Sequence, residues 1–315
     1  MKIKDIYQLI IREGMAKDPR GTDVEKYLEN INKEEQDLKE DAKKYFDQDK
    51  LFNPYSDTRV LYGDLNREVK TIIAGIDIET QELLLADRLR EKGTKIDLVL
   101  AHHPEGKALV GLYEVMRLQE DMLYNLGVPI NIAQGILSSR ISEVQRNLLP
   151  LNHNRGVDAA RLLDLPFMCA HTPADNQVQH FLEETFNKEQ PETVGDVIKI
   201  LKEIPEYQEA MYLGTGPQVV AGKEKNRAGK ILVDMTGGTS GSEKAYEKMA
   251  AAGIGTIIGM HMGDKHREEA EKNYINVIIA GHIASDSLGM NLLLDQLENQ
   301  GIEVLTFSGL TRVRR

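Results

Sequence analysis

Three short apolar segments of the chain, each typical of a buried strand, end in histidine. The segments and their histidines are 96–101 with His102 and His103, 166–170 with His171, and 276–281 with His282. In an open α/β sheet the active crevice lies outside the carboxyl ends of the strands, so we expect these imidazoles to converge. Imidazole is a common metal ligand, and the clustering therefore indicates a metal site.

Carboxylates near the histidines refine this prediction. Asp175 and Asp286 each follow a histidine by four residues. Imidazole and carboxylate ligands without thiolate suit Zn, Mn, Fe(II) or Co. Because neighbouring side chains alternate across a strand, His102 and His103 diverge and could serve two ions, while a bridging aspartate would help to generate hydroxide from water. The histidine pair alone would also fit two hydrogen-bonded polar groups at a strand end, but the other two segments favour a dinuclear centre.

These motifs resemble, in their order, those of the NGG-interacting-factor-three-like family, whose bacterial members are called GTP cyclohydrolase 1 type 2 homologues. The matching elements are His-His-Pro at 102–104, His-Thr-x-x-Asp at 171–175 and Gly-His-x-x-x-acid at 281–286, within a resemblance that spans about 57–312. The resemblance implies two divalent metal ions per chain (Zn, Fe, Mn or Co) and a closed homo-oligomer, a hexamer or another trimer-based ring. The implied ligands are His102, His103, Asp175, His282 and Asp286, with Asp175 as the bridging ligand.

The chain departs from the family pattern in four ways. Asp286 stands where the family usually has Glu, which is also an oxygen ligand. A long segment precedes the His-Thr-x-x-Asp motif, which leaves His153 or Glu143 as competitors for the role given to Asp175. The leading segment, 1–55, is longer than is typical of the family. Only about fifty residues separate Asp175 from the next strand, so we expect the compact form without an inserted domain.

The glycine-rich turn 236–242 lies between a predicted strand and a predicted helix. Its amides could hold a phosphate or another anion at the helix start. A tight turn that needs glycine for positive φ, with Ser240 or Ser242 as N-cap, explains the sequence equally well. Because the resembled family has a similar turn near its metal cleft, we expect substrate-binding residues here. They are Gly237, Gly238 and Ser240, together with His171 beside the metals.

Two further side chains are candidates for acid–base catalysis. His261 follows the predicted strand 256–260, and an imidazole titrates near neutral pH, although a role in a polar loop fits as well. Glu105 follows the histidine pair and could accept a hydrogen bond from a ligating imidazole. His266, in the same loop as His261, is an alternative acid or base.

The remaining pattern predicts the elements that position these residues. Strand, helix and strand are predicted at 71–76, 80–92 and 97–101, and a second series at 231–235, 242–252, 256–260, 276–280 and 287–299. Helices are predicted from 3 to 14 and from 22 into a charged stretch at 33–50, which favours a solvated surface over a partner surface. The predicted fold class is α/β, with two similar halves whose mixed sheets surround a central metal cleft. We divide the chain into a helical N-terminal extension at 1–55, a first half at 56–190 and a second half at 191–315.

Composition narrows the classes of function. The net charge of −11 and a pI near 5.3 argue against direct binding of nucleic acid or of anionic membranes. The single cysteine, Cys169, cannot form an intramolecular disulfide, and neither a signal peptide nor an apolar run of ~18 residues is present. We therefore expect a cytoplasmic protein.

Taken together, these features predict a metal-dependent, GTP cyclohydrolase-like hydrolase that acts on a nucleotide-like or phosphorylated small molecule. Two alternatives need no catalysis. One is a metal-handling or metallocentre-insertion protein that uses the same ligands for transfer. The other is a regulatory interaction protein that contacts its partner through the charged N-terminal helices.

Overall fold

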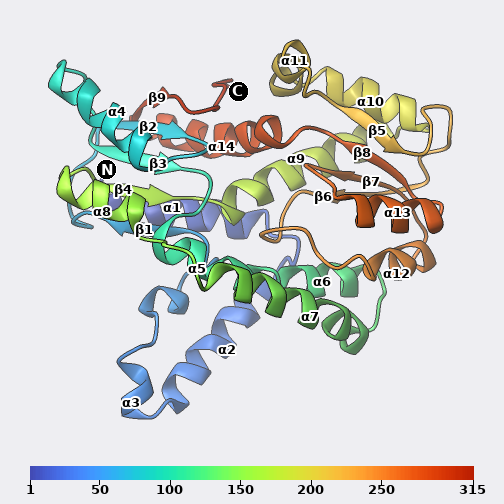
Figure 1. Ribbon diagram of the computed structural model, residues 1–315, viewed down its shortest axis with the longest axis horizontal. Coiled ribbons are helices and arrows are strands. Elements are labelled where there is room, and N and C mark those ends of the chain that lie inside the picture. Colours follow the sequence, from blue (N-terminus) through green and yellow to red (C-terminus); the bar gives the residue numbers. More distant parts are fainter.

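The computed structural model describes residues 1–315, which form two β-sheets with helices around and between them (Figure 1). The five-stranded sheet consists, in spatial order, of β1 (Arg59–Tyr62), β4 (Phe167–Cys169), β3 (Leu98–Ala101), β2 (Thr71–Gly75) and β9 (Glu303–Thr306). The four-stranded sheet consists of β5 (Gln218–Ala221), β8 (Asn276–Ile279), β7 (Ile254–Gly259) and β6 (Lys230–Asp234). The edge strands β1 and β5 are antiparallel to their neighbours and all other pairs are parallel, so both sheets are mixed, as predicted.

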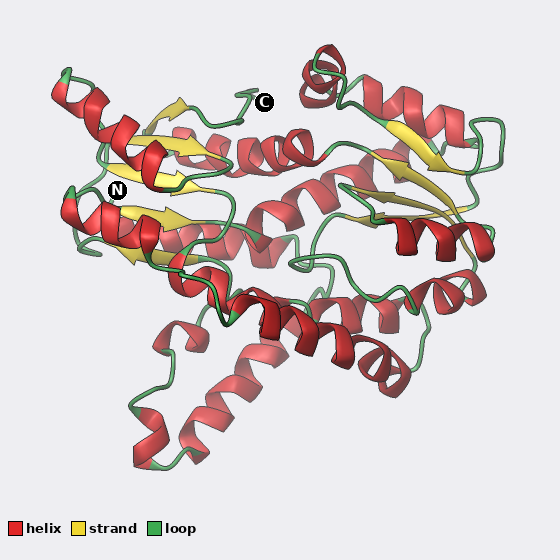
Figure 2. Cartoon of the chain, in the orientation of Figure 1, coloured by secondary structure: helices red, strands yellow, loops and turns green.

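Helices cover both sheets and occupy the space between them (Figure 2). In chain order they are α1 (Ile3–Ala16), α2 (Asp23–Asp37), α3 (Glu40–Lys43), α4 (Thr80–Glu91), α5 (Gly106–Val115), α6 (Leu118–Asn125), α7 (Ile130–Leu148), α8 (Arg155–Leu162), α9 (Thr172–Glu189), α10 (Val194–Lys202), α11 (Pro205–Tyr212), α12 (Ala245–Ala251), α13 (Asp264–Lys272) and α14 (His282–Asn299). A short 3-10 helix, η1 (Gln48–Leu51), precedes β1. None of these helices combines the length and the apolarity needed to cross a lipid bilayer.

The N-terminal helices differ in how they contact the rest of the protein. α1 buries Ile3, Ile6 and Ile10 completely in the core that also contains the side chains of β2 and α14. α2 buries only Val24, and together with α3 it projects from the body of the molecule (Figure 1). α2 ends at Asp37, before most of the charged stretch, because the next residue has an extended backbone.

The last strand corrects the predicted division of the chain. β9 pairs in parallel with β2, with Thr71 opposite Glu303, so it belongs to the first sheet. Val304 is buried in the same core as Ile72. Assigning all of 191–315 to a second half was therefore wrong for this strand, because its apolar face completes the core of the first sheet.

α9 and α14 begin just beyond the carboxyl ends of β4 and β8 and pack along each other between the sheets (Figure 1). A Cβ atom on Gly289 of α14 would lie 2.3 Å from the carbonyl oxygen of Ala174 in α9, so only glycine permits this approach. Asp175 directly follows Ala174, and Asp286 precedes Gly289 by three residues. The close helix contact therefore places these two carboxylates side by side.

Two predicted helix starts were wrong. α14 begins at His282 rather than at 287, because Gly281 adopts a φ of +117° and turns the chain directly from β8 into the helix. α12 begins at Ala245 rather than at 242, since positive φ at Gly237 and Gly238 keeps the preceding segment in a loop. Lys244, not Ser240 or Ser242, is the N-cap of α12.

Candidate metal centre

The three histidine-ending strands bring their histidines to one place, as predicted. β3 delivers His102 and His103, β4 delivers His171, and the first residue of α14 is His282. The rings of His102 and His103 are 5.1 Å apart, and that of His171 lies 4.8 Å from His102. The His282 ring lies 5.4 Å from that of His103. Four imidazoles from strands far apart in sequence thus share one cluster.

Two carboxylates join this cluster at distances that fit shared metal coordination. The Nε2 atom of His102 lies 3.4 Å from Oδ1 of Asp286 and 3.5 Å from Oδ1 of Asp175. The Nε2 atoms of His103 and His282 lie 3.5 and 3.6 Å from the other Asp286 oxygen. These separations are longer than an N–H···O hydrogen bond. They match two ligand atoms bound to one ion at ~2.1 Å, which at a tetrahedral angle are roughly 3.4 Å apart.

The same carboxylates have no hydrogen-bond partners. Oδ1 of Asp175 and both side-chain oxygens of Asp286 are buried and unpaired. Buried polar atoms are nearly always paired, so three unpaired carboxylate oxygens beside imidazole nitrogens indicate a site suited to a cation. These buried His and Asp groups could therefore hold a metal ion.

Asp286 is shared between donor groups. It belongs to the group of His103 and His282 and to the group of His102 and Asp175. Asp175, which the sequence-based interpretation made the bridging ligand, belongs only to the second of these groups. Geometry therefore favours Asp286 as the bridging carboxylate.

The histidine pair is oriented by contacts at the opposite ring nitrogen. Nδ1 of His102 donates to the carbonyl oxygen of Ala170 at 3.2 Å, and Nδ1 of His103 donates to Asp77 at 2.6 Å. A partner at Nδ1 fixes the tautomer in which the Nε2 lone pair faces the cleft, which is the form that binds metal. Asp77 was not among the predicted residues, although its position just beyond β2 places it at the same sheet edge.

His171 is held in the same way by a buried carboxylate. Its Nδ1 atom donates to Oδ2 of Asp57 at 2.8 Å, and the Thr172 hydroxyl donates to the same oxygen at 2.6 Å. Burial would raise the pKa of Asp57, but these hydrogen bonds lower it, so the carboxylate stays charged. Predicted as a substrate-binding residue, His171 lines the cleft and lies within a donor group with His102 and His103.

The electrostatics of the cluster favour a cation. Burial lowers the pKa of His102 to about 4, which keeps its imidazole neutral. Burial and the nearby charge of Asp286 raise the pKa of Asp175 to about 7. Burial would raise the pKa of Asp286 too, but the adjacent imidazoles lower it strongly. A divalent ion would relieve the repulsion between the two carboxylates.

A polar cavity of about 70 Å³ adjoins the cluster, and the glycine-rich loop is part of its lining. Gly238 and Ser240 line it, and the Ser240 hydroxyl lies 3.3 Å from Nδ1 of His261. Gly237 instead packs on Gln119, whose side-chain amide donates to its carbonyl oxygen at 2.8 Å. The positive φ of both glycines confirms the tight turn, but neither Ser240 nor Ser242 caps a helix. The predicted anion site at a helix start is wrong, because no helix begins in this turn.

His261 is the one predicted acid–base residue that reaches the cavity. Its ring lies 5.0 Å from that of His282, and burial lowers its pKa. The carboxylate of Glu105 lies against Gly156 of α8, where burial raises its pKa to about 7, and it makes no hydrogen bond to a ligating imidazole. His266 packs against Tyr246.

Other residues correct or extend the predicted site. His153 donates to the Leu148 carbonyl oxygen, and Glu143 pairs with Arg140, so neither replaces Asp175 as a ligand. Asp234, at the end of β6, borders the cavity with an exposed side chain. Asp234 was not among the predicted residues, although it too ends a strand.

The fold and the cluster define an α/β protein with a candidate metal centre between two mixed sheets. No family model and no curated protein matches the sequence. Among solved structures, a NIF3 superfamily protein from Sphaerobacter thermophilus is 30% identical, with a TM-score of 0.72 over 81% of this chain and 92% of that chain. The chain therefore belongs to the NIF3 superfamily, which confirms the family predicted from its motifs. The fold is also similar to that of reduced HcgD from Methanocaldococcus jannaschii, at 17% identity and a TM-score of 0.51 over 89% and 96% of the two chains.

Proposed function

We propose that this protein binds two divalent metal ions per chain and hydrolyses a nucleotide-like or phosphorylated small molecule. The observation that carries the proposal is the set of unpaired, buried oxygens of Asp175 and Asp286 that face imidazole nitrogens. His102, Asp175 and one oxygen of Asp286 would hold the first ion, and His103, His282 and the other oxygen would hold the second. His171, which forms a group with His102 and His103, would be a further donor. This donor set suits Zn, Fe, Mn or Co.

The chemistry divides between the ions and the side chains around the cavity. Bound divalent ions lower the pKa of coordinated water to about 7 and so supply hydroxide at neutral pH. Asp286 would contribute one oxygen to each ion site, and Asp77 keeps His103 in the tautomer that can bind metal. His261 is oriented by Ser240 and, with its lowered pKa, is neutral at pH 7 and able to accept a proton.

The cavity also supplies the substrate contacts in this proposal. The loop with Gly238 and Ser240 lines the same cavity as the ligand cluster, and hydrogen bonds from the Gln119 side chain to the carbonyl oxygens of Gly237 and Thr239 fix the loop. Asp234 and His261 border the same space and would contact hydrogen-bond donors of a bound molecule. A largely polar lining fits a phosphorylated or nucleotide-like substrate better than an apolar one.

Elemental analysis tests the proposal directly. The gently purified protein should carry about two transition-metal ions per chain, and the His102→Ala plus His103→Ala variant should carry almost none. His180→Ala, whose ring contacts Lys17 on the surface, is the matched control and should keep both ions. A screen of GTP and other phosphorylated compounds with the native metal should then detect hydrolysis. Absence of metal in the wild-type protein after incubation with Zn, Mn or Fe(II) would overturn the proposal.

A metal-handling role is the second candidate, and the unequal exposure of the two donor groups favours it. The side chains of His103 and His282 are 27% and 42% exposed, whereas that of His102 is 1% exposed. An ion held by the exposed pair would exchange more readily. Rapid chelator release of one ion, with no hydrolysis of any screened compound, would favour this role over catalysis.

A further inference from the structure

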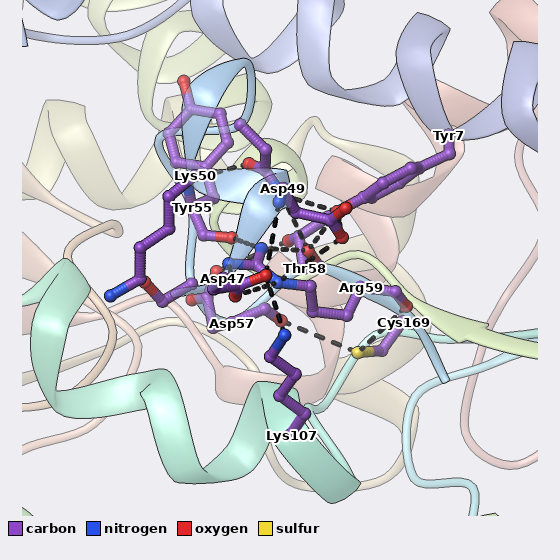
Figure 3. Close-up of polar contacts among 12 residues, drawn as sticks. Tyr7, Asp47, Asp49, Lys50, Tyr55, Asp57, Thr58, Arg59, Lys107 and Cys169 are labelled. Carbon is purple, nitrogen blue, oxygen red and sulfur yellow. Dashed lines mark hydrogen bonds and ion pairs between the residues drawn. The ribbon is translucent and has the colours of Figure 1, made fainter. Parts of the chain in front are cut away.

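We infer that the segment 47–59 positions the metal centre: Asp57 orients the His171 imidazole toward the cleft, and Arg59 holds the turn that carries Asp57. This inference rests on the proposed metal binding. It assigns a role to the buried polar network of Figure 3, which no part of the proposed chemistry uses.

The sheet explains why this segment reaches the site. β1 runs antiparallel to β4, with Arg59 opposite Cys169. The start of β1 therefore lies beside the end of β4, so the turn 55–58 before β1 faces the residues that follow β4. This strand pairing brings Asp57 into contact with His171, although 114 positions separate them in the chain.

Asp57 determines which nitrogen of His171 faces the cleft. Its side chain is fully buried, and its Oδ2 atom accepts from Nδ1 of His171 at 2.8 Å and from the Thr172 hydroxyl at 2.6 Å. The hydroxyl of Thr58 accepts from the backbone N–H of His171 at 3.1 Å, which fixes the main chain as well. In the neutral imidazole the proton stays on Nδ1, so Nε2 is left free to act as a further donor to a metal ion, in one group with His102 and His103.

Arg59 fixes the turn from inside the protein. Its side chain is 2% exposed, and Nη1 donates to the carbonyl oxygens of Tyr55 and Thr58, the two ends of the turn. The rest of the guanidinium pairs with Asp47, at 3.3 Å from Nε and 3.1 Å from Nη2. Lys107 of α5 contacts the other Asp47 oxygen at 2.7 Å. The turn can move only if this ion-paired cluster breaks.

α1 and the segment before β1 add further contacts to the same turn. The Tyr7 hydroxyl and the Asn53 amide both donate to the Thr58 carbonyl oxygen, at 3.1 and 2.8 Å. Asn53 also accepts from the backbone N–H of Tyr55 at 2.8 Å. The leading segment is thus connected to the donor cluster through hydrogen bonds, and its removal should impair metal binding.

Asp57→Asn tests the inference with two measurements. Long-range ¹H–¹⁵N spectra of the metal-free protein at pH 10, above the pKa of about 9 to which Asp175 and Asp57 raise His171, report the tautomer of its neutral imidazole. Chelator competition reports the affinity for Co²⁺. We expect His171 to lose its fixed Nδ1–H form and the Co²⁺ affinity to fall about 10- to 100-fold. Asp47→Asn, which leaves Asp57 in place, should give a smaller loss. Because Asp47 is partly exposed, we expect Asp47→Asn to fold. If Asp57→Asn does not fold, the same two measurements are made on Asp47→Asn.

Glu206→Gln is the control for general destabilisation. Glu206 is a buried carboxylate paired with Arg315, and it contacts none of the donor residues. This variant should lower the urea midpoint yet keep the Co²⁺ affinity within twofold of the wild type. An unchanged tautomer and affinity in Asp57→Asn, or an equal loss in Glu206→Gln, would overturn the inference. If the wild-type protein binds no Co²⁺, the proposed function fails, while the tautomer spectra still decide whether Asp57 orients His171.

Discussion

Protonation of His171 couples the stability of the metal-free protein to pH. Burial lowers the pKa of this imidazole, but Asp175 and Asp57 outweigh it and raise the pKa to about 9. An unfolded histidine titrates near 6.5. Between pH 6.5 and 9 the folded chain therefore binds more protons than the unfolded chain, so its stability falls as pH rises. Urea unfolding of metal-free protein at pH 6.5, 8 and 9 should show this fall, and His171→Gln should flatten it. A slope equal in both proteins would contradict the assignment.

The two ligating aspartates should differ in how many ions depend on them. Each oxygen of Asp286 faces a different imidazole group, whereas Asp175 belongs to one group of carboxylate and imidazole donors. We expect Asp286→Asn to lose nearly all bound metal and Asp175→Asn to retain about one ion per chain. Metal analysis of the two isosteric variants decides this, and equal retention would show that neither residue is the dominant bridge.

At the scale of elements, the contact between α9 and α14 sets the spacing of the carboxylates. Gly289→Ala would place a methyl group against the Ala174 carbonyl oxygen and force the helices apart. We expect a loss of about 1–3 kcal/mol in unfolding free energy and weaker metal binding. Gly135→Ala in α7 is the control, because a Cβ there meets open space and should stabilise the helix by roughly 0.5–1 kcal/mol. Wild-type metal affinity in Gly289→Ala would contradict this account.

Local sequence patterns predicted the candidate metal ligands, but not the residues that orient those ligands. His102, His103 and His282 could be predicted because each follows a short apolar strand in the chain itself. Asp57 could not be assigned its role, because its contact with His171 depends on the pairing of β1 with β4. The bridging position of Asp286 likewise depends on the helix contact at Gly289, which no residue pattern within α14 reveals.

At the scale of the whole molecule, we expect assembly into a hexamer or another trimer-based ring. Exposed leucines on α4 and α8, including Leu84, Leu85 and Leu162, provide apolar surface of the kind that subunit contacts cover. Light scattering should give a mass of three or six times 35.4 kDa. A monomeric mass at micromolar concentration would show that the donor cluster forms within an isolated chain.

The return of β9 to the first sheet has a consequence for biosynthesis. All strands of the four-stranded sheet lie between residues 218 and 279, so they can pair as soon as that stretch has left the ribosome. The five-stranded sheet begins at Arg59 but lacks its outer parallel strand until residue 306 has emerged. Domains generally fold in the order of their synthesis, yet here the part that begins first is completed last. In the nascent chain the backbone N–H and C=O groups on the edge of β2 that later pairs with β9 therefore stay unpaired throughout the synthesis of the second sheet.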